Sequence, residues 1–336
     1  MYRNPDPAPV RPLSAAADDA ASAVGDSEEL AVNGRLLAEN EDVESEKTVV
    51  KIHQLKGGDA IRSNRPVWLT AKLSDLDITR DDFINHWAVY GTIEGNYHGT
   101  KAKINVYDLP ELTGHQASSA ALALWNNKGA ENAIAAGVHV YPDLHHDNKV
   151  HFFTFWTADG SRSTGCYNLI CPGFVTINSS ELKPGAELFP VSVYDGEQRY
   201  ITISIKKDEK TGDWSLYRED LGTTELVGFW PKTLFSDLAE TASGVQWGGT
   251  VSYIKGEKSP PMGSGHFPIE REGKAAYFKN IGLFDGDGDP INSLDGIENA
   301  GTDQPDCYKV SSFEDSSEQA KDDGYMFYYG GPGGCN

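Results

Sequence analysis

The chain of 336 residues lacks three features, each of which would place it in a large class of proteins. It contains no apolar run near the roughly 20 residues that a membrane-spanning helix requires, so we expect no membrane span. Residues 1–30 show no basic segment followed by an apolar core, so the chain as given predicts no signal peptide. Basic residues are scarce, with 29 Lys and Arg against 50 Asp and Glu. Because nucleic-acid backbones are bound by clustered Lys and Arg, this balance argues against nucleic acid as a partner.

Cysteine is also scarce, and the positions of the four cysteines are informative. Cys166 and Cys171 lie close together around a predicted turn, whereas Cys307 and Cys335 flank the C-terminal segment. An even count, with each pair in its own segment, predicts the disulfides Cys166–Cys171 and Cys307–Cys335. A zinc site would need two pairs of closely spaced ligands, and Cys307 and Cys335 are too far apart in the sequence to form the second pair. We therefore expect no metal, and we expect no cofactor. Disulfides indicate a secreted or secretory-pathway protein, while the missing signal peptide leaves a cytoplasmic protein as the alternative.

Composition divides the chain into a leader and a longer, strand-rich part. Residues 1–46 are rich in Ala, Asp, Glu and Pro, and we expect a disordered acidic leader because they can bury little apolar surface. After a short segment at 47–82, residues 83–336 alternate aromatic and β-branched runs with Gly, Pro and Asp turns. This pattern predicts an all-β fold, an antiparallel β-sandwich with a short N-terminal extension. We expect strands at 150–156, 202–205 and 245–254, and a short helix in the Ala-rich run 116–125.

Several sequence blocks within residues 83–336 occur together in one order. They are Trp87-Ala-Val, Ala102-Lys-Ile-Asn105, Val140-Tyr-Pro142, Phe155-Trp-Thr157, Thr164 to Val175, Gly228-Phe-Trp-Pro231, Trp247-Gly-Gly249, Met262 to Pro268 and Tyr328-Tyr-Gly-Gly-Pro332. In these blocks the chain resembles the neprosin family, plant-type glutamic peptidases that cut beside proline. The resemblance implies a neprosin-like sandwich at 83–336 with a substrate cleft on a concave face. It also makes residues 47–82 a propeptide-like remnant.

The two catalytic glutamates of that family are missing from this chain. The family has them in Ile-Glu-Ala-Gly-Trp and Trp-Gly-Gly-Glu-Val blocks, where this sequence has Ala135 and Thr250. A glutamic peptidase needs two carboxyl groups on one water, one of which takes its proton. Ala135 has no proton to exchange, and the Thr250 hydroxyl is no base unless another group activates it. We therefore predict that the domain is inactive as a glutamic peptidase.

The resemblance places further residues around the lost glutamates. The candidate cleft residues are Ala123, Val138, His139, Tyr141, Trp156, Tyr167, Trp247 and His266. In a strand, His139 would share a face with Ala135, because side chains repeat every two residues. Ala123, Ala135 and Val138 in place of larger or polar residues would make the cleft wider and less polar.

Two other motifs could bind a cation. His145-His146-Asp147 and His151 could approach a metal, but we favour a turn with solvated histidines. Asp285-Gly-Asp-Gly-Asp289 begins like a calcium loop, yet positions six and twelve are Pro290 and Gly296. An acidic surface turn is therefore the favoured interpretation.

Three functions are compatible with this sequence. The first is a non-catalytic protein that binds a peptide, glycan or partner protein in the cleft. The second is a repurposed enzyme, such as a cyclase or isomerase of specialised metabolism, acting on a small apolar molecule there. The third is a residual proline-directed peptidase. The predicted disulfides favour the first, and the missing signal peptide favours the second.

Overall fold

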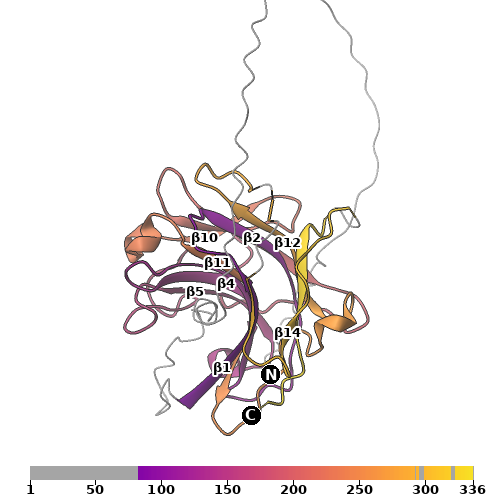
Figure 1. The fold of residues 1–336 in the computed structure, drawn as a ribbon. Helices are drawn as coiled ribbons and strands as arrows, with labels where there is room; N and C mark the ends of the chain where they lie inside the picture. Colours follow the sequence, from indigo (N-terminus) through magenta and orange to yellow (C-terminus); the bar gives the residue numbers. More distant parts are fainter. Residues whose placement is uncertain (1–81, 292, 295–298, 319–321, 336) are drawn as a thin grey trace, which may run out of the picture. The chain divides into compact units, whose positions relative to one another are not determined.

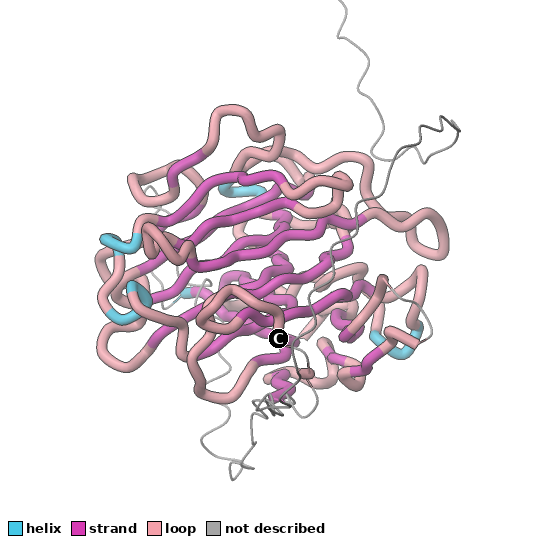
Figure 2. The backbone as a smooth tube through the Cα atoms, turned by 90° about the horizontal axis from the view of Figure 1, so that it is seen from above, coloured by secondary structure: helices cyan, strands magenta, loops and turns pink. Residues whose placement is uncertain are grey.

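The computed structural model describes residues 82–335 except 292, 295–298 and 319–321. These residues form two antiparallel β-sheets stacked face to face (Figure 1). Figure 2 shows that strands dominate both layers and that helix is confined to short turns. The predicted antiparallel β-sandwich is thus confirmed. The predicted leader at 1–46 and the segment at 47–82, apart from residue 82, lie outside the described residues.

The first sheet, called sheet A here, has seven strands in the described part of the chain. Their spatial order is β13 (Asn299–Thr302), β1 (Phe83–Gly91), β11 (Gly244–Ile254), β3 (Ala117–Asn126), β4 (Asn132–Val140), β5 (Val150–Thr157) and β6 (Cys166–Tyr167). Chain neighbours β3, β4 and β5 lie side by side, whereas β11 arrives from far along the sequence to pair with both β1 and β3.

The second sheet, called sheet B here, has nine strands among the described residues. Their order is β14 (Lys309–Val310), β16 (Tyr325–Gly330), β12 (Ala276–Phe284), β2 (Gly99–Asn105), β8 (Tyr200–Lys207), β9 (Trp214–Arg218), β10 (Glu225–Trp230) and β7 (Val175–Thr176), with β15 (Glu314–Asp315) also paired to β16. The helical turns are α2 (Pro142–His145), η3 (Lys232–Leu234), η4 (Asp237–Ala239) and η5 (Pro268–Glu270).

The expected strands at 150–156, 202–205 and 245–254 all form, as β5, β8 and β11. The Ala-rich run expected to be a helix is instead strand β3. Hydrogen bonding to β11 along one edge and to β4 along the other satisfies its backbone, and outweighs the helix propensity of alanine. Its side chains alternate, with Ala120 and Leu122 in the core between the sheets and Ala121 and Ala123 on the opposite face.

The core between the sheets is built around large aromatic side chains. Trp214, Trp230 and Trp247 are completely buried there, together with Phe278 and Phe327. The indole N–H of Trp247 on β11 donates a hydrogen bond of 2.9 Å to the Thr100 hydroxyl on β2, so it links the two sheets. Burial of each such ring contributes about 2–3 kcal/mol or more to folding.

Both predicted disulfides are present. Cys166–Cys171 closes a short loop after β6, and Cys307–Cys335 ties the C-terminal segment to the loop before β14. No cysteine in the described residues is free. Two disulfides indicate an oxidising, secretory-type environment. In the same residues, we find no helix with the length and apolar character needed to cross a membrane.

We predict that the two disulfides contribute unequally to stability. Closing the longer loop, with a sequence separation of 28, should stabilise the fold by about 3 to 4 kcal/mol; the shorter one, with a separation of 5, should contribute about 2 kcal/mol. Urea unfolding of the Cys307→Ser/Cys335→Ser and Cys166→Ser/Cys171→Ser variants measures both. Equal losses, or four free thiols in the unreduced protein, would contradict the prediction.

Candidate functional site

The face of sheet A that points away from sheet B carries a second apolar cluster, separate from the main core. We call this face the outer face of sheet A. Its apolar members are Ala117, Ala121, Ala123, Ala135, Tyr141, Phe153, Phe155 and Tyr167, with Leu144 packed against them. They come from β3, β4, β5 and β6 and from helix α2, because alternate residues of each strand point to the same side.

Ala135 and Thr250, the two positions that the sequence blocks predict for the family's glutamates, both lie on this face. Ala135 on β4 pairs with Ala123 on β3 and with Phe155 on β5. Thr250 on β11 pairs with Ser119, which in turn pairs with His139. Both Ala135 and Thr250 have no exposed surface.

The outward positions of the central strands contain no carboxyl group in the described part of sheet A. They are Gln246, Gly248, Thr250 and Ser252 on β11; Ala117, Ser119, Ala121, Ala123 and Trp125 on β3; Ala133, Ala135, Gly137 and His139 on β4; and His151, Phe153, Phe155 and Thr157 on β5. The ionisable side chains among them are therefore two histidines.

Three predicted cleft residues point the other way. Val138, Trp156 and Trp247 belong to the core between the sheets, because each alternates with an outward-facing neighbour in its strand. The sequence predicted that Val138 would widen a cleft beside Ala135. Because its side chain points into the core between the sheets, it cannot do so. His266 lies elsewhere, stacked on Tyr194 at 4.0 Å between ring centroids. The structure brings together only Ala123, His139, Tyr141 and Tyr167 with Ala135.

Helix α2 and strands β4 and β5 assemble a group of ionisable residues that we call the histidine cluster: His139, His145, His151 and Asp147. The Nε2 atoms of His139 and His145 are 2.7 Å apart, and the rings of His145 and His151 stack in parallel at 3.8 Å. His151 contacts Asp147 through Nε2 and the Gly185 carbonyl through Nδ1, each at 2.9 Å. His139 and His151 are 1% and 6% exposed. The expectation of solvated loop histidines is therefore wrong for His145 and His151.

The sequence contains a signal for this cluster in the hairpin that joins β4 to β5. The β4–β5 hairpin pairs His139 with His151, and the single turn of α2 folds His145 back over them. A hairpin centred on Pro142 to Lys149 would have predicted the first contact. The same register would have identified Ser119 as the neighbour of His139 on β3.

Burial controls the charge of these histidines. Burial first, and then the nearby His145 and His151, hold the pKa of His139 well below its usual range. Burial and the neighbouring His151 lower the pKa of His145 to about 4. Both rings are therefore neutral at neutral pH, and one donates its Nε2–H to the other. In the described chain, no three His, Cys, Asp or Glu side chains are arranged to hold a metal ion.

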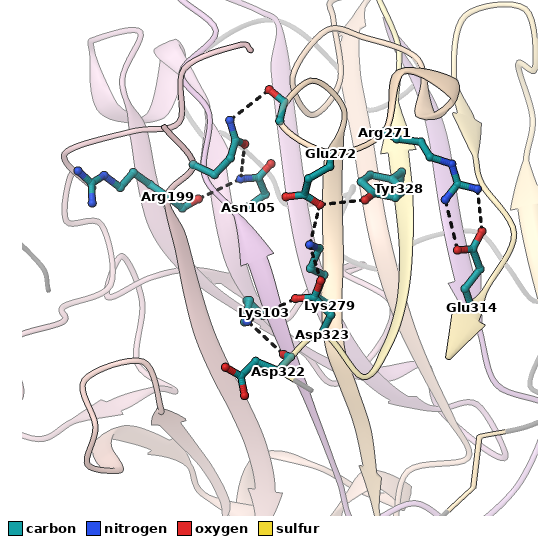
Figure 3. Close-up of polar contacts among 12 residues, drawn as sticks. Lys103, Asn105, Arg199, Arg271, Glu272, Lys279, Glu314, Asp322, Asp323 and Tyr328 are labelled. Atoms are coloured by element: carbon teal, nitrogen blue, oxygen red, sulfur yellow. Dashed lines mark hydrogen bonds and ion pairs between the residues drawn. The ribbon is translucent and has the colours of Figure 1, made fainter. Parts of the chain in front are cut away.

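A second polar group lies on the outer face of sheet B (Figure 3). The Lys279 ammonium donates hydrogen bonds of 2.7 Å to Glu272 and 2.8 Å to Asp323, and the Tyr328 hydroxyl donates one of 2.9 Å to Glu272. Figure 3 also shows Arg271 paired with Glu314. Lys279 lies between two carboxylates, and the Lys103 ammonium lies 3.9 Å from the second of them, Asp323, so this network of ion pairs fastens loops to β12 and β16.

The acidic run at 285–289 forms a closed turn. The Asp285 carboxylate accepts hydrogen bonds from the backbone N–H groups of Asp287 and Asp289, at 3.1 and 2.9 Å. The Asp285 side chain thus caps its own turn.

Residues 114–332 match the sequence model of a family described as Neprosin. Among solved structures, the chain is similar to scytalido-glutamic peptidase bound to a transition state analog inhibitor, with 12% identity, a TM-score of 0.40, and coverage of 74% of this chain and 98% of that chain. It is also similar to SCP-B, a member of the Eqolisin family of peptidases, in complex with the tripeptide Ala-Ile-His, at 11% identity, a TM-score of 0.37 and the same coverage of 74% and 98%. A match to the Ruminococcus gnavus IT-sialidase CBM40 has 11% identity, a TM-score of 0.23 and coverage of 51% of this chain and 91% of that chain.

The buried histidines make stability depend on pH. Because the folded-state pKa of His145 is lowered from 6.5 to about 4, the unfolded chain takes up a proton in this interval that the folded chain does not. The free energy of unfolding should therefore be largest above pH 6.5 and fall as the pH decreases toward 4. Urea titrations at several pH values in this window measure the slope.

The His145→Phe variant should show a shallower slope, because it removes one of the buried groups that must be protonated. His98→Asn is the matched control, because His98 lies outside the histidine cluster and is not among the groups that shift the pKa of His145. Identical slopes in the wild type and His145→Phe would contradict the assignment.

Proposed function

The chain belongs to the neprosin family, and from that membership we propose that it is a ligand-binding member that does not work as a glutamic peptidase. The observation that carries the proposal is the lack of any carboxyl group at the outward positions of β11, β3, β4 and β5, within the residues described. With no carboxyl pair there, this face lacks the two acids that a glutamic peptidase uses to activate water.

Apolar and aromatic groups dominate the proposed binding face. Its aromatic members are Tyr141, Phe153, Phe155 and Tyr167, with small alanines between them; the two tyrosines keep 9% and 8% of their surface exposed, whereas the two phenylalanines are fully buried. Such a surface suits uncharged ligands, and aromatic rings pack well against proline. Of a peptide, a glycan and a partner protein, a peptide segment with apolar residues including proline therefore fits best.

A second candidate function, an enzyme acting on a small apolar molecule, is favoured by a different observation. His139 lies on this face, two residues from Gly137 and in one cross-strand row with Ser119. Its hydrogen-bonded contact with His145 gives it the arrangement of an oriented acid–base group. This candidate needs a compact ligand that reaches the imidazole.

We predict no cleavage of proline-containing peptides by the purified protein at acidic pH. General acid–base groups contribute about 10²–10⁴-fold each, so loss of two should bring turnover to the uncatalysed level. Mass spectrometry of the incubated peptides detects products, and fluorescence anisotropy of the same labelled peptides measures binding. Efficient cleavage after proline would contradict the proposal, and absence of binding would leave only the second candidate.

Restoring the lost acids tests how far the site has diverged. We expect the Ala135→Glu/Thr250→Glu variant to fold, because the family scaffold carries glutamates at these positions, but to show little or no peptidase activity. Ala123 and Phe155 flank Ala135 and offer no hydrogen bond, so nothing would position the new carboxyl or the water; misplacement by about 1 Å can cost 10²-fold in rate.

The same double change should abolish binding of an apolar ligand, since buried charges carry a large desolvation cost. Circular dichroism provides the control for folding. Recovery of strong cleavage after proline would show that the face is otherwise an intact peptidase site.

A further inference from the structure

One ring nitrogen of the histidine cluster is left without a role by the contacts around it. The Nδ1 atom of His139 is buried and has no hydrogen-bond partner in the described part of the structure. A buried polar atom without a partner destabilises the folded state, and most buried polar atoms in native proteins have a hydrogen-bond partner. An unsatisfied atom at this depth therefore points to a ligand that completes its hydrogen bonding.

The surroundings of His139 indicate what kind of ligand would fit. The imidazole stacks on Phe153 with ring centroids 4.5 Å apart and an interplanar angle of 11°. The rings of Tyr141 and Tyr167 are 6.0 and 5.6 Å away. Ser119, opposite His139 on β3, is the nearest small hydroxyl residue in this row. A flat, largely apolar molecule with one polar position matches these neighbours.

The other ring nitrogen is held by a second histidine. The Nε2 atom of His139 lies 2.7 Å from Nε2 of His145, whose ring stacks on His151, and His151 contacts Asp147. When His139 donates its Nε2–H to His145, its Nδ1 keeps a free lone pair. Titratable groups face His139 from each neighbouring element. They are Tyr141, which follows β4; His145 on α2; Asp147 in the turn after α2; His151 on β5; and Tyr167 on β6.

We propose that His139 accepts a proton at Nδ1 from a compact, largely apolar carbon acid bound on the outer face of sheet A, and that His145 orients it. This deepens the second candidate function and rests on the use of this face as a ligand site. A C–H bond of the substrate breaks, its proton moves to Nδ1, and the electron pair moves into an adjacent carbonyl or equivalent group. Return of the proton to another atom gives an isomer, so no oxidant, reductant or second substrate is needed.

The probe for this chemistry is 5-nitrobenzisoxazole, a flat molecule with one acidic C–H. Removal of that proton by a base breaks the ring N–O bond, and the oxygen leaves with the electron pair as the coloured 2-cyano-4-nitrophenolate. The accepted proton then passes to solvent. We expect the wild type to accelerate this reaction and His139→Phe to lose about 100-fold or more of the rate, since that is the usual contribution of a general base.

Three further variants separate chemistry from folding. The His139→Phe ring can still stack on Phe153, and circular dichroism shows whether the variant folds. His266→Phe is the matched control, because His266 also stacks on an aromatic ring but lies outside the cluster; it should keep the wild-type rate. His145→Phe should slow the reaction, and His145→Gln should recover part of the rate because the amide can still hydrogen-bond to His139.

A separate binding measurement distinguishes failure of the proton-transfer proposal from failure of the ligand-binding proposal. Binding of 6-nitrobenzotriazole, an unreactive molecule of similar shape, is measured by calorimetry on the wild type and His139→Phe. Binding to the wild type without acceleration of the elimination, or equal rates in the wild type and folded His139→Phe, overturns the proton-transfer proposal and leaves ligand binding standing. No binding of the analogue and no acceleration overturns both for this class of ligand.

Discussion

The spacing between the two sheets at strand β11 is the constraint on which the rest of the structure depends. A Cβ atom at Gly249 would lie 2.6 Å from both the Met262 sulfur and the Tyr329 ring, so only glycine lets β16 of sheet B pack this closely. Beside it, the Trp247 indole reaches Thr100 on β2. These inward contacts fix the alternation of β11 and thereby place Thr250 on the outer face. The register of β11 against β3 then sets Ser119 and His139 in line with it.

The same rule of close approach governs the middle of the outer face. A Cβ at Gly137 would lie 2.0 Å from the Ala120 carbonyl oxygen and 2.7 Å from the Ala121 Cα. Strand β4 therefore lies tightly against β3 between the Ala135 and His139 positions. The two outer faces of the molecule consequently differ in chemistry. That of sheet A carries an apolar cluster with two histidines at one end, whereas the cluster around Lys279 on sheet B is made of ion pairs.

Much of the fold could be predicted from the sequence because its signals are local or covalent. The strands β5, β8 and β11 follow from aromatic and β-branched runs, and the disulfides from the position of each cysteine pair. The prediction of a helix in place of strand β3 is wrong because the helix propensity of alanine is a local property. The pairing of β3 with β4 and β11 depends on residues elsewhere in the sequence, and it decides the structure. Sequence blocks predict Ala135 and Thr250 as the family's glutamate positions, but they do not predict to which face of the sheet the neighbouring side chains point. The prediction that Trp247 and Val138 line the cleft is wrong for this reason, since the alternation of side chains along each strand points both of them into the core. The histidine cluster depends on a hairpin register and one helical turn, which composition cannot supply.

The pairing of β1 with β11 has a consequence for how this molecule is made. Phe83 pairs with Ile254 and Gly91 with Gln246, so β1 has no partner on that edge until the chain has been synthesised past residue 254. At roughly 5–20 residues per second, the interval from 83 to 254 lasts about 10 to 30 s. During that time an apolar strand with an unpaired edge is exposed to other nascent chains. The pairing of β1 therefore cannot form until β11 has been synthesised, and chaperones that shield strand edges should matter more for this protein than for one whose neighbouring strands are consecutive.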